Sequence, residues 1–233
     1  MTITLIFLAL LMGAILWWLF RQTVNVQPWV AAGPVPDVRS GVLARPTAKT
    51  ALIVFLGVAT SLFALFISAY AMRIQFLDWR PLPQPRLLTF NTAILVVASM
   101  AMEWTAFAAR RGNLQSVRTG LLVSGVLTFS FLAGQLWVWK QLSEAGYFVA
   151  TSAATGFFYL LTAAHGAHVV GGLVAWGRTS TRAWHGIDFP RLRLGVELCA
   201  IYWHFLLLVW VVLLAVLVSN DLGLAICTPS VSL

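Results

Sequence analysis

Six long apolar stretches dominate the pattern of hydrophobic and polar positions along the 233-residue chain. They cover residues 3–20, 51–72, 87–109, 119–139, 147–176 and 194–218. A helix rises about 1.5 Å per residue, so each stretch can cross the hydrocarbon core of a membrane, about 30 Å thick, although the first only just reaches that length. The pattern predicts an all-α, polytopic membrane helix bundle with six transmembrane helices.

The apolar runs and the prolines also predict how the chain is divided. Residues 1–20 form an N-terminal transmembrane helix, and residues 21–49 form a cytoplasmic linker in which four prolines disfavour a long helix. Residues 50–220 form a five-helix core, and residues 221–233 form a C-terminal tail. Within the core, the proline-rich loop at 76–86 is predicted to be extended.

Composition and charge agree with a membrane protein. Hydrophobic residues make up 60% of the chain and charged residues only 9%, against about 25% charged residues in globular proteins. The net charge of +8 comes from basic residues in the loops, and no nucleic-acid-binding motif accompanies it. With the N-terminus outside, eleven of the 15 Lys and Arg residues face the cytoplasm. The positive-inside rule therefore places both termini on the periplasmic side.

Tryptophans lie near the ends of several predicted spans. They are Trp17, Trp18, Trp79, Trp137, Trp139, Trp176 and Trp184. The indole ring is amphipathic and favours the membrane–water interface, so we expect these side chains to form aromatic belts.

Five ionisable side chains lie inside the predicted spans and require an explanation, because such groups are costly in hydrocarbon. They are Glu103, His165, His168, Glu197 and His204. Measured from the predicted cytoplasmic ends of their helices, His168, His165 and His204 lie at depths of about 12, 16 and 15 Å. The two glutamates lie nearer the cytoplasmic boundary. We therefore predict one polar cluster in the inner half of the bundle, joined by interhelical hydrogen bonds.

Other roles for these residues remain open from the sequence alone. Imidazole is a common ligand of metals and haem, yet His165 and His168 are only three residues apart and cannot bind opposite faces of one haem. A copper site would be expected to add Cys, Met or further His, and none is nearby. A lipid-headgroup or proton-linked role and a small transporter also remain alternatives. No constellation of side chains indicates nucleophilic catalysis, and we expect neither a catalytic site nor a metal ion in the chain itself.

Two motifs near the C-terminus carry a family resemblance. The fifth span matches the pattern T-x-x-H-G-x-H-V-x-x-G through Thr162, His165, Gly166, His168, Val169 and Gly172. The sixth span places Glu197 before a Y-W-H-F motif that is followed by a further tryptophan: Tyr202, Trp203, His204, Phe205 and Trp210. The third span contains the dipeptide Asn91-Thr92. In these residues the chain resembles subunit III of the haem-copper terminal oxidases, the cytochrome c and quinol oxidases.

The resemblance implies a non-catalytic accessory subunit of a respiratory oxidase that reduces oxygen to water. Such a subunit has no redox cofactor of its own. It packs beside catalytic subunit I, which holds haem and copper, and beside other oxidase subunits. It stabilises the catalytic subunit and binds phospholipid from the surrounding membrane lipids. The expected location is the bacterial inner membrane, with no nucleic-acid partner. The alternatives are an accessory protein of a nitric oxide reductase, a small membrane transporter or a haem-binding redox protein.

The chain departs from the family pattern at three positions where an acidic residue is usual. Ala59, Val138 and Leu207 occupy these positions. The resemblance therefore does not imply an acidic proton-uptake path in this chain.

Overall fold

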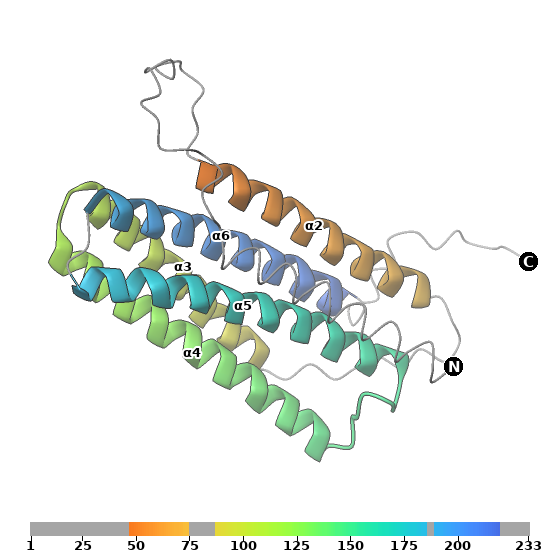
Figure 1. Cartoon of the computed structure of the whole chain (residues 1–233). Helices are drawn as coiled ribbons and strands as arrows, with labels where there is room; N and C mark the ends of the chain where they lie inside the picture. The colour runs from red at the N-terminus through yellow and green to blue at the C-terminus, as the bar shows by residue number, and fades with distance from the viewer. Residues whose placement is uncertain (1–46, 75–86, 186–188, 220–233) are drawn as a thin grey trace, which may run out of the picture. The chain divides into compact units, whose positions relative to one another are not determined.

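The computed structural model describes residues 47–74, 87–185 and 189–219. It contains five helices in this part of the chain, namely α2 (Thr47–Arg73), α3 (Leu87–Arg110), α4 (Leu114–Glu144), α5 (Ala153–His185) and α6 (Phe189–Ser219) (Figure 1). All five are long and apolar enough to cross a membrane. The predicted all-α membrane bundle is confirmed for these helices.

Several predictions concern residues outside the described ranges. They are the helix at 3–20, the linker before residue 47, the loop at 76–86, the C-terminal tail, and the interfacial positions of Trp17, Trp18 and Trp79. The sixth helix and the side of the membrane on which the termini lie therefore stay predictions.

Helices α3 to α6 pack as a four-helix bundle in which each helix contacts the next and α6 returns to α3. The most extensive packing joins α3 and α4. Helix α2 lies outside this bundle, beside α6 in Figure 1, and contacts α5 and α6 but neither α3 nor α4 within the described ranges. Its few buried side chains include Ala59, Phe63 and Tyr70.

The helices extend beyond the apolar stretches that predicted them. Helices α4 and α6 have 31 residues and α5 has 33, which corresponds to about 46 to 50 Å at 1.5 Å per residue. Backbone hydrogen bonds continue the helix into the interfacial region, where charged residues such as Arg182 are tolerated. An apolar stretch in the sequence ends at the first charged residue, so its length underestimates the length of the helix.

The start of α5 corrects the predicted fifth span, because the helix begins at Ala153 and not at Tyr147. Gly146, just after α4, has a left-handed backbone with φ of 85°, a conformation that glycine adopts at low cost. A turn follows, and the Ser152 hydroxyl then accepts a hydrogen bond from the Thr155 backbone N–H at 3.2 Å. This N-cap fixes the beginning of α5.

Close contact between α4 and its neighbours depends on glycines. A methyl group added at Gly125 would overlap the indole ring of Trp176 on α5, and one added at Gly134 would overlap the side chain of Asn91 on α3. Small residues allow helix backbones to approach closely in membranes, where packing replaces the hydrophobic effect as the attraction between helices. The two glycines therefore set how near α4 lies to α5 and to α3.

Replacing Gly125 by alanine should destabilise the bundle by about 1 to 3 kcal/mol, because the Trp176 ring must shift to make room. The measurement is the free energy of unfolding of the purified chain in detergent micelles. Gly57→Ala on α2 is the control, since nothing lies within 4 Å of the added methyl group. Equal destabilisation by both substitutions would contradict this account of the α4–α5 contact.

Candidate functional site

Three residues of the Y-W-H-F region donate hydrogen bonds from α6 to three different helices. The Trp203 indole N–H bonds to Thr128 Oγ1 on α4 at 3.1 Å, and the Trp210 indole N–H bonds to Thr92 Oγ1 on α3 at 2.9 Å. The Tyr202 hydroxyl donates to the His168 carbonyl oxygen on α5 at 2.9 Å. These residues therefore position α6 against the rest of the bundle.

Two further indole groups join α4 and α5. The Trp139 N–H bonds to Thr162 Oγ1 at 3.1 Å, and the Trp176 N–H bonds to the Leu121 carbonyl oxygen at 3.0 Å. Both side chains are half-buried. Their donors are therefore used between helices, and their predicted place in the aromatic belts stays a prediction.

The predicted belt residues Trp137 and Trp184 are exposed. The Lys140 ammonium lies 5.6 Å from the Trp137 ring centroid, and the Arg118 guanidinium lies 5.1 Å from the Trp184 ring. Aromatic rings beside cations near helix ends are typical of the interface. Their interfacial role stays a prediction.

An amide pair lies in the core between α3 and α4. Asn91 is fully buried, and its Nδ2 donates to the Phe131 carbonyl oxygen at 3.1 Å and to Gln135 Oε1 at 3.4 Å. Thr92, the other member of the Asn-Thr dipeptide, accepts the bond from Trp210. The dipeptide thus bonds to two helices at once.

The three histidines occupy different surroundings and do not form the predicted hydrogen-bonded cluster. His165 is fully buried, with its ring centroid 5.9 Å from that of Phe131 and 5.0 Å from that of Trp210. Neither of its ring nitrogens has a hydrogen-bond partner within the described ranges. Its contacts across the bundle are therefore aromatic ones.

His168 and His204 bond to their own helices. His168 Nδ1 lies 2.8 Å from the Ala164 carbonyl oxygen, and its ring packs 5.1 Å from that of Phe63 on α2. His204 Nδ1 lies 2.7 Å from the Ala200 carbonyl oxygen, and its side chain is exposed. Residues that are level along the membrane normal can still point in different directions around their helices, and depth alone cannot distinguish these cases.

The two glutamates also separate. Glu197 Oε2 lies 2.9 Å from Lys49 Nζ on α2, and its Oε1 lies 3.1 Å from Arg193 Nε one turn away. This ion pair joins the beginning of α2 to α6. Glu103 is exposed on α3 and has no ion-pair or hydrogen-bond partner in the part of the chain that the structure describes. Glu103 therefore forms no ion pair with Arg110, which lies two turns further along α3.

The remaining motif residues support the packing. Thr162 accepts the bond from Trp139 and donates to the Phe158 carbonyl oxygen. A methyl group at Gly172 would overlap the Tyr202 ring, whereas Gly166 has open space beside it. The Phe205 ring lies 6.4 Å from that of Tyr202. Across the described ranges no group of three or more His, Cys, Asp or Glu residues is placed to hold a metal ion.

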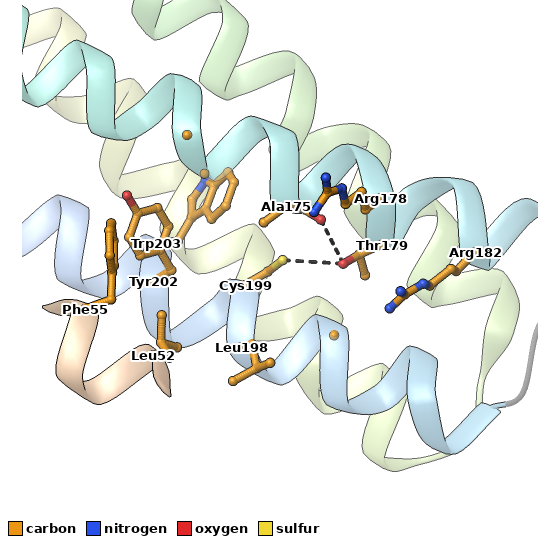
Figure 2. A pocket seen from close by; sticks show the side chains of 13 residues that line it. Leu52, Phe55, Ala175, Arg178, Thr179, Arg182, Leu198, Cys199, Tyr202 and Trp203 are labelled. Atoms are coloured by element: carbon orange, nitrogen blue, oxygen red, sulfur yellow. Dashed lines mark hydrogen bonds between the residues drawn. The ribbon is translucent and has the colours of Figure 1, made fainter. Parts of the chain in front are cut away.

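A groove of about 430 Å³ lies between α2, α5 and α6. Its lining is mostly apolar and includes Leu52, Phe55, Ala175, Leu198, Cys199 and Trp203 (Figure 2). Arg178 and Arg182, one helical turn apart on α5, lie at one end of it. Both arginines are exposed and have no acidic partner in the described part of the chain.

The sequence prediction missed several residues of these contacts. Thr128 and Lys49 had no motif to mark them, and their partners became visible only when the helices were placed side by side. Arg178 and Arg182 carried a usable signal, because two arginines four residues apart lie on one face of a helix near its end. In the sequence prediction they count only as cytoplasmic positive charges and not as a ligand site.

The chain is similar in sequence to known proteins. The family model for cytochrome c oxidase subunit III matches residues 49–219. A probable cytochrome c oxidase subunit 3 from Mycobacterium tuberculosis is 30% identical over 160 residues, covering 67% of this chain and 77% of that protein. The cytochrome c oxidase subunit 3 of Thermostichus vulcanus is 28% identical over 171 residues, covering 71% of this chain and 84% of that protein.

A double-mutant cycle should reveal the bond between Trp203 and Thr128. We expect Trp203→Phe and Thr128→Val to couple by about 1 kcal/mol in the free energy of unfolding, because each removes one partner of the same interhelical hydrogen bond. Trp137→Phe combined with Thr128→Val is the control, and its effects should add. Additive effects of the first pair would show that the bond does not hold α6 to α4.

Proposed function

The chain belongs to the cytochrome c oxidase subunit III family, and we propose that it acts as a non-catalytic accessory subunit that stabilises the catalytic subunit of a respiratory haem-copper oxidase and binds lipid. The observation that carries this proposal is the use of the family's aromatic motif. Three of its side chains donate their hydrogen bonds to neighbouring helices, namely Tyr202, Trp203 and Trp210. Because these donors hold the helices of this chain together, they fit a structural subunit that supports catalysis in a partner subunit.

The partner in this proposal is catalytic subunit I, with haem and copper bound by that partner and not by this chain. The histidines favour cofactor binding by the partner, because they do not converge on one site. The His165 ring lies in the core, the His168 ring faces α2, and the His204 ring faces the outer surface. The bacterial relatives favour the bacterial inner membrane as the location.

The apolar groove is the proposed lipid site. Acyl chains fit its apolar lining, and Arg178 and Arg182 supply positive charge where an anionic phospholipid headgroup would lie. In the predicted topology this end of α5 faces the cytoplasm, whose membrane leaflet carries anionic lipids. Two arginines without an acidic partner nearby are available for a phosphate group.

Affinity purification of the tagged chain in mild detergent should recover a haem-containing partner. The measurements are the absorption spectrum, the copper content and the reduction of oxygen or of nitric oxide by the recovered complex. We expect oxygen reduction by the complex, and neither haem absorption nor stoichiometric copper in the isolated chain. Recovery of the chain alone would contradict the proposal. Reduction of nitric oxide instead would favour the reductase alternative, and a bis-histidine haem spectrum would favour a redox protein.

Lipid retention should depend on the two arginines of the groove. Arg178→Gln combined with Arg182→Gln should weaken retention of anionic phospholipid roughly tenfold or more, because each arginine contributes about 1 kcal/mol near a charged headgroup. The measurement is mass spectrometry of the lipids that co-purify with the complex. Arg111→Gln is the control, since Arg111 is exposed near the end of α3 and stacks on Phe107. Equal losses in both variants would contradict a specific site.

A further inference from the structure

Two ionisable side chains lie on the outside of the bundle, well within the helices that cross the membrane. In the described ranges Glu103 on α3 and His204 on α6 are exposed, whereas His165 is buried and Glu197 is paired with Lys49. Exposure at this position in a membrane means contact with lipid, with another protein or with residues outside the described ranges, of which the predicted span at 3–20 contains no Lys or Arg. An ionisable group facing only hydrocarbon is costly, which favours a polar partner at its position.

Each residue belongs to an exposed strip of its helix. On α3 the strip consists of Val96, Met100, Glu103 and Phe107, and on α6 it consists of Ile201, His204, Leu208 and Val211. The residues of each strip are three or four positions apart and therefore lie on one helix face. Together we call these residues the α3–α6 surface.

The two strips adjoin each other. Glu103 lies eleven residues, about three helical turns, after Thr92, so it is on the side of α3 where Thr92 accepts the bond from Trp210 of α6. Helix α6 contacts both α2 and α3, and these two do not contact each other within the described ranges. The exposed strip of α6 therefore lies between α2 and α3, next to the strip of α3.

Both polar groups on this surface can accept a hydrogen bond. A carbonyl oxygen can only accept, so the contact between His204 Nδ1 and the Ala200 oxygen requires the proton on Nδ1. In the neutral ring this leaves Nε2 as an acceptor. The Glu103 carboxylate is also an acceptor and lies seven residues, about 10 Å, from the end of α3. A partner surface must therefore supply donors.

We propose that the α3–α6 surface is covered by a transmembrane helix of another subunit, which presents a lysine or arginine to Glu103 and a hydrogen-bond donor to His204. The inference rests on the proposed function as an accessory subunit. In a symmetric dimer this surface would meet itself, and none of its residues is a Lys or Arg that could pair with Glu103. Lipid tails offer no donors, and anionic headgroups repel the carboxylate.

The exposed face of α4 provides the contrast. Leu122, Val126 and Leu136 are exposed there, and no ionisable residue occurs between residues 119 and 139. A face without ionisable groups is suited to lipid. The charge pattern therefore distinguishes the surface that docks from the surface that faces the bilayer.

Photo-crosslinking in native membranes tests which surface docks. A photoreactive amino acid is placed at Met100 or Leu208 on the α3–α6 surface, and at Val126 or Leu136 on α4 as controls of similar exposure. We expect the first two positions to capture a subunit of the co-purifying haem complex, through a membrane segment that contains Lys or Arg. Capture of a second copy, lipid adducts alone, or equal capture from α4 would overturn the proposal.

A charge substitution tests the chemistry of the contact. Glu103→Lys should reduce recovery of the haem-containing partner at least about tenfold, because it opposes like charges in an interface. Leu122→Lys is the control, since it places a lysine at comparable depth on α4, where the side chain can reach the interface. Unfolding of each isolated variant shows whether the fold is intact. Unchanged recovery with Glu103→Lys would overturn the proposed ion pair.

The same preparations separate the two proposals. If the unmodified chain recovers no haem-containing partner, the accessory function fails. If it does recover one and the crosslinks come only from α4, the function stands and the docking surface is wrong. Once the partner's basic residue is known, Glu103→Lys combined with a carboxylate at that residue should restore recovery.

Discussion

Hydrogen bonds from one helix to several others are the constraint on which this bundle depends. Lipid tails are as apolar as the helices, so the hydrophobic effect does not bring the helices together once they are inserted. Packing and buried hydrogen bonds must do so. The aromatic residues Tyr202, Trp203 and Trp210 meet both needs, because each fills the core with a large ring and donates to a different helix. The groove and the α3–α6 surface both depend on the resulting position of α6.

The sequence was sufficient to predict helices and insufficient to predict their neighbours. Apolar length identified all five described helices, since a membrane span must be long and apolar. The helix ends were less accurate, because caps such as Ser152 depend on local hydrogen bonds and not on hydropathy. The family motifs identified Tyr202, Trp203 and Trp210, whereas Thr128 could not be identified, because a threonine in a span has many possible partners until the helices are packed.

The polar cluster shows the same limit in the candidate site. Depth along the membrane was estimated from the residue count, but direction around the helix depends on which neighbours occupy each side. His165 and His168 are three residues apart, which turns one ring about 60° from the other around the helix axis. That difference is enough for His165 to face Phe131 and Trp210 in the core while His168 faces Phe63 on α2.

The position of α2 has a consequence for how the protein is made. Within the described ranges α2 contacts α5 and α6 and neither of the helices between. It leaves the ribosome before these partners, which are the last of the described helices to be synthesised. Among the described helices, α2 is therefore made before the two it contacts, and Lys49 has no Glu197 to pair with until α6 is synthesised. The uninterrupted apolar sequence of α2 suits this interval, because a span without internal charges is stable in lipid before α5 and α6 pack against it.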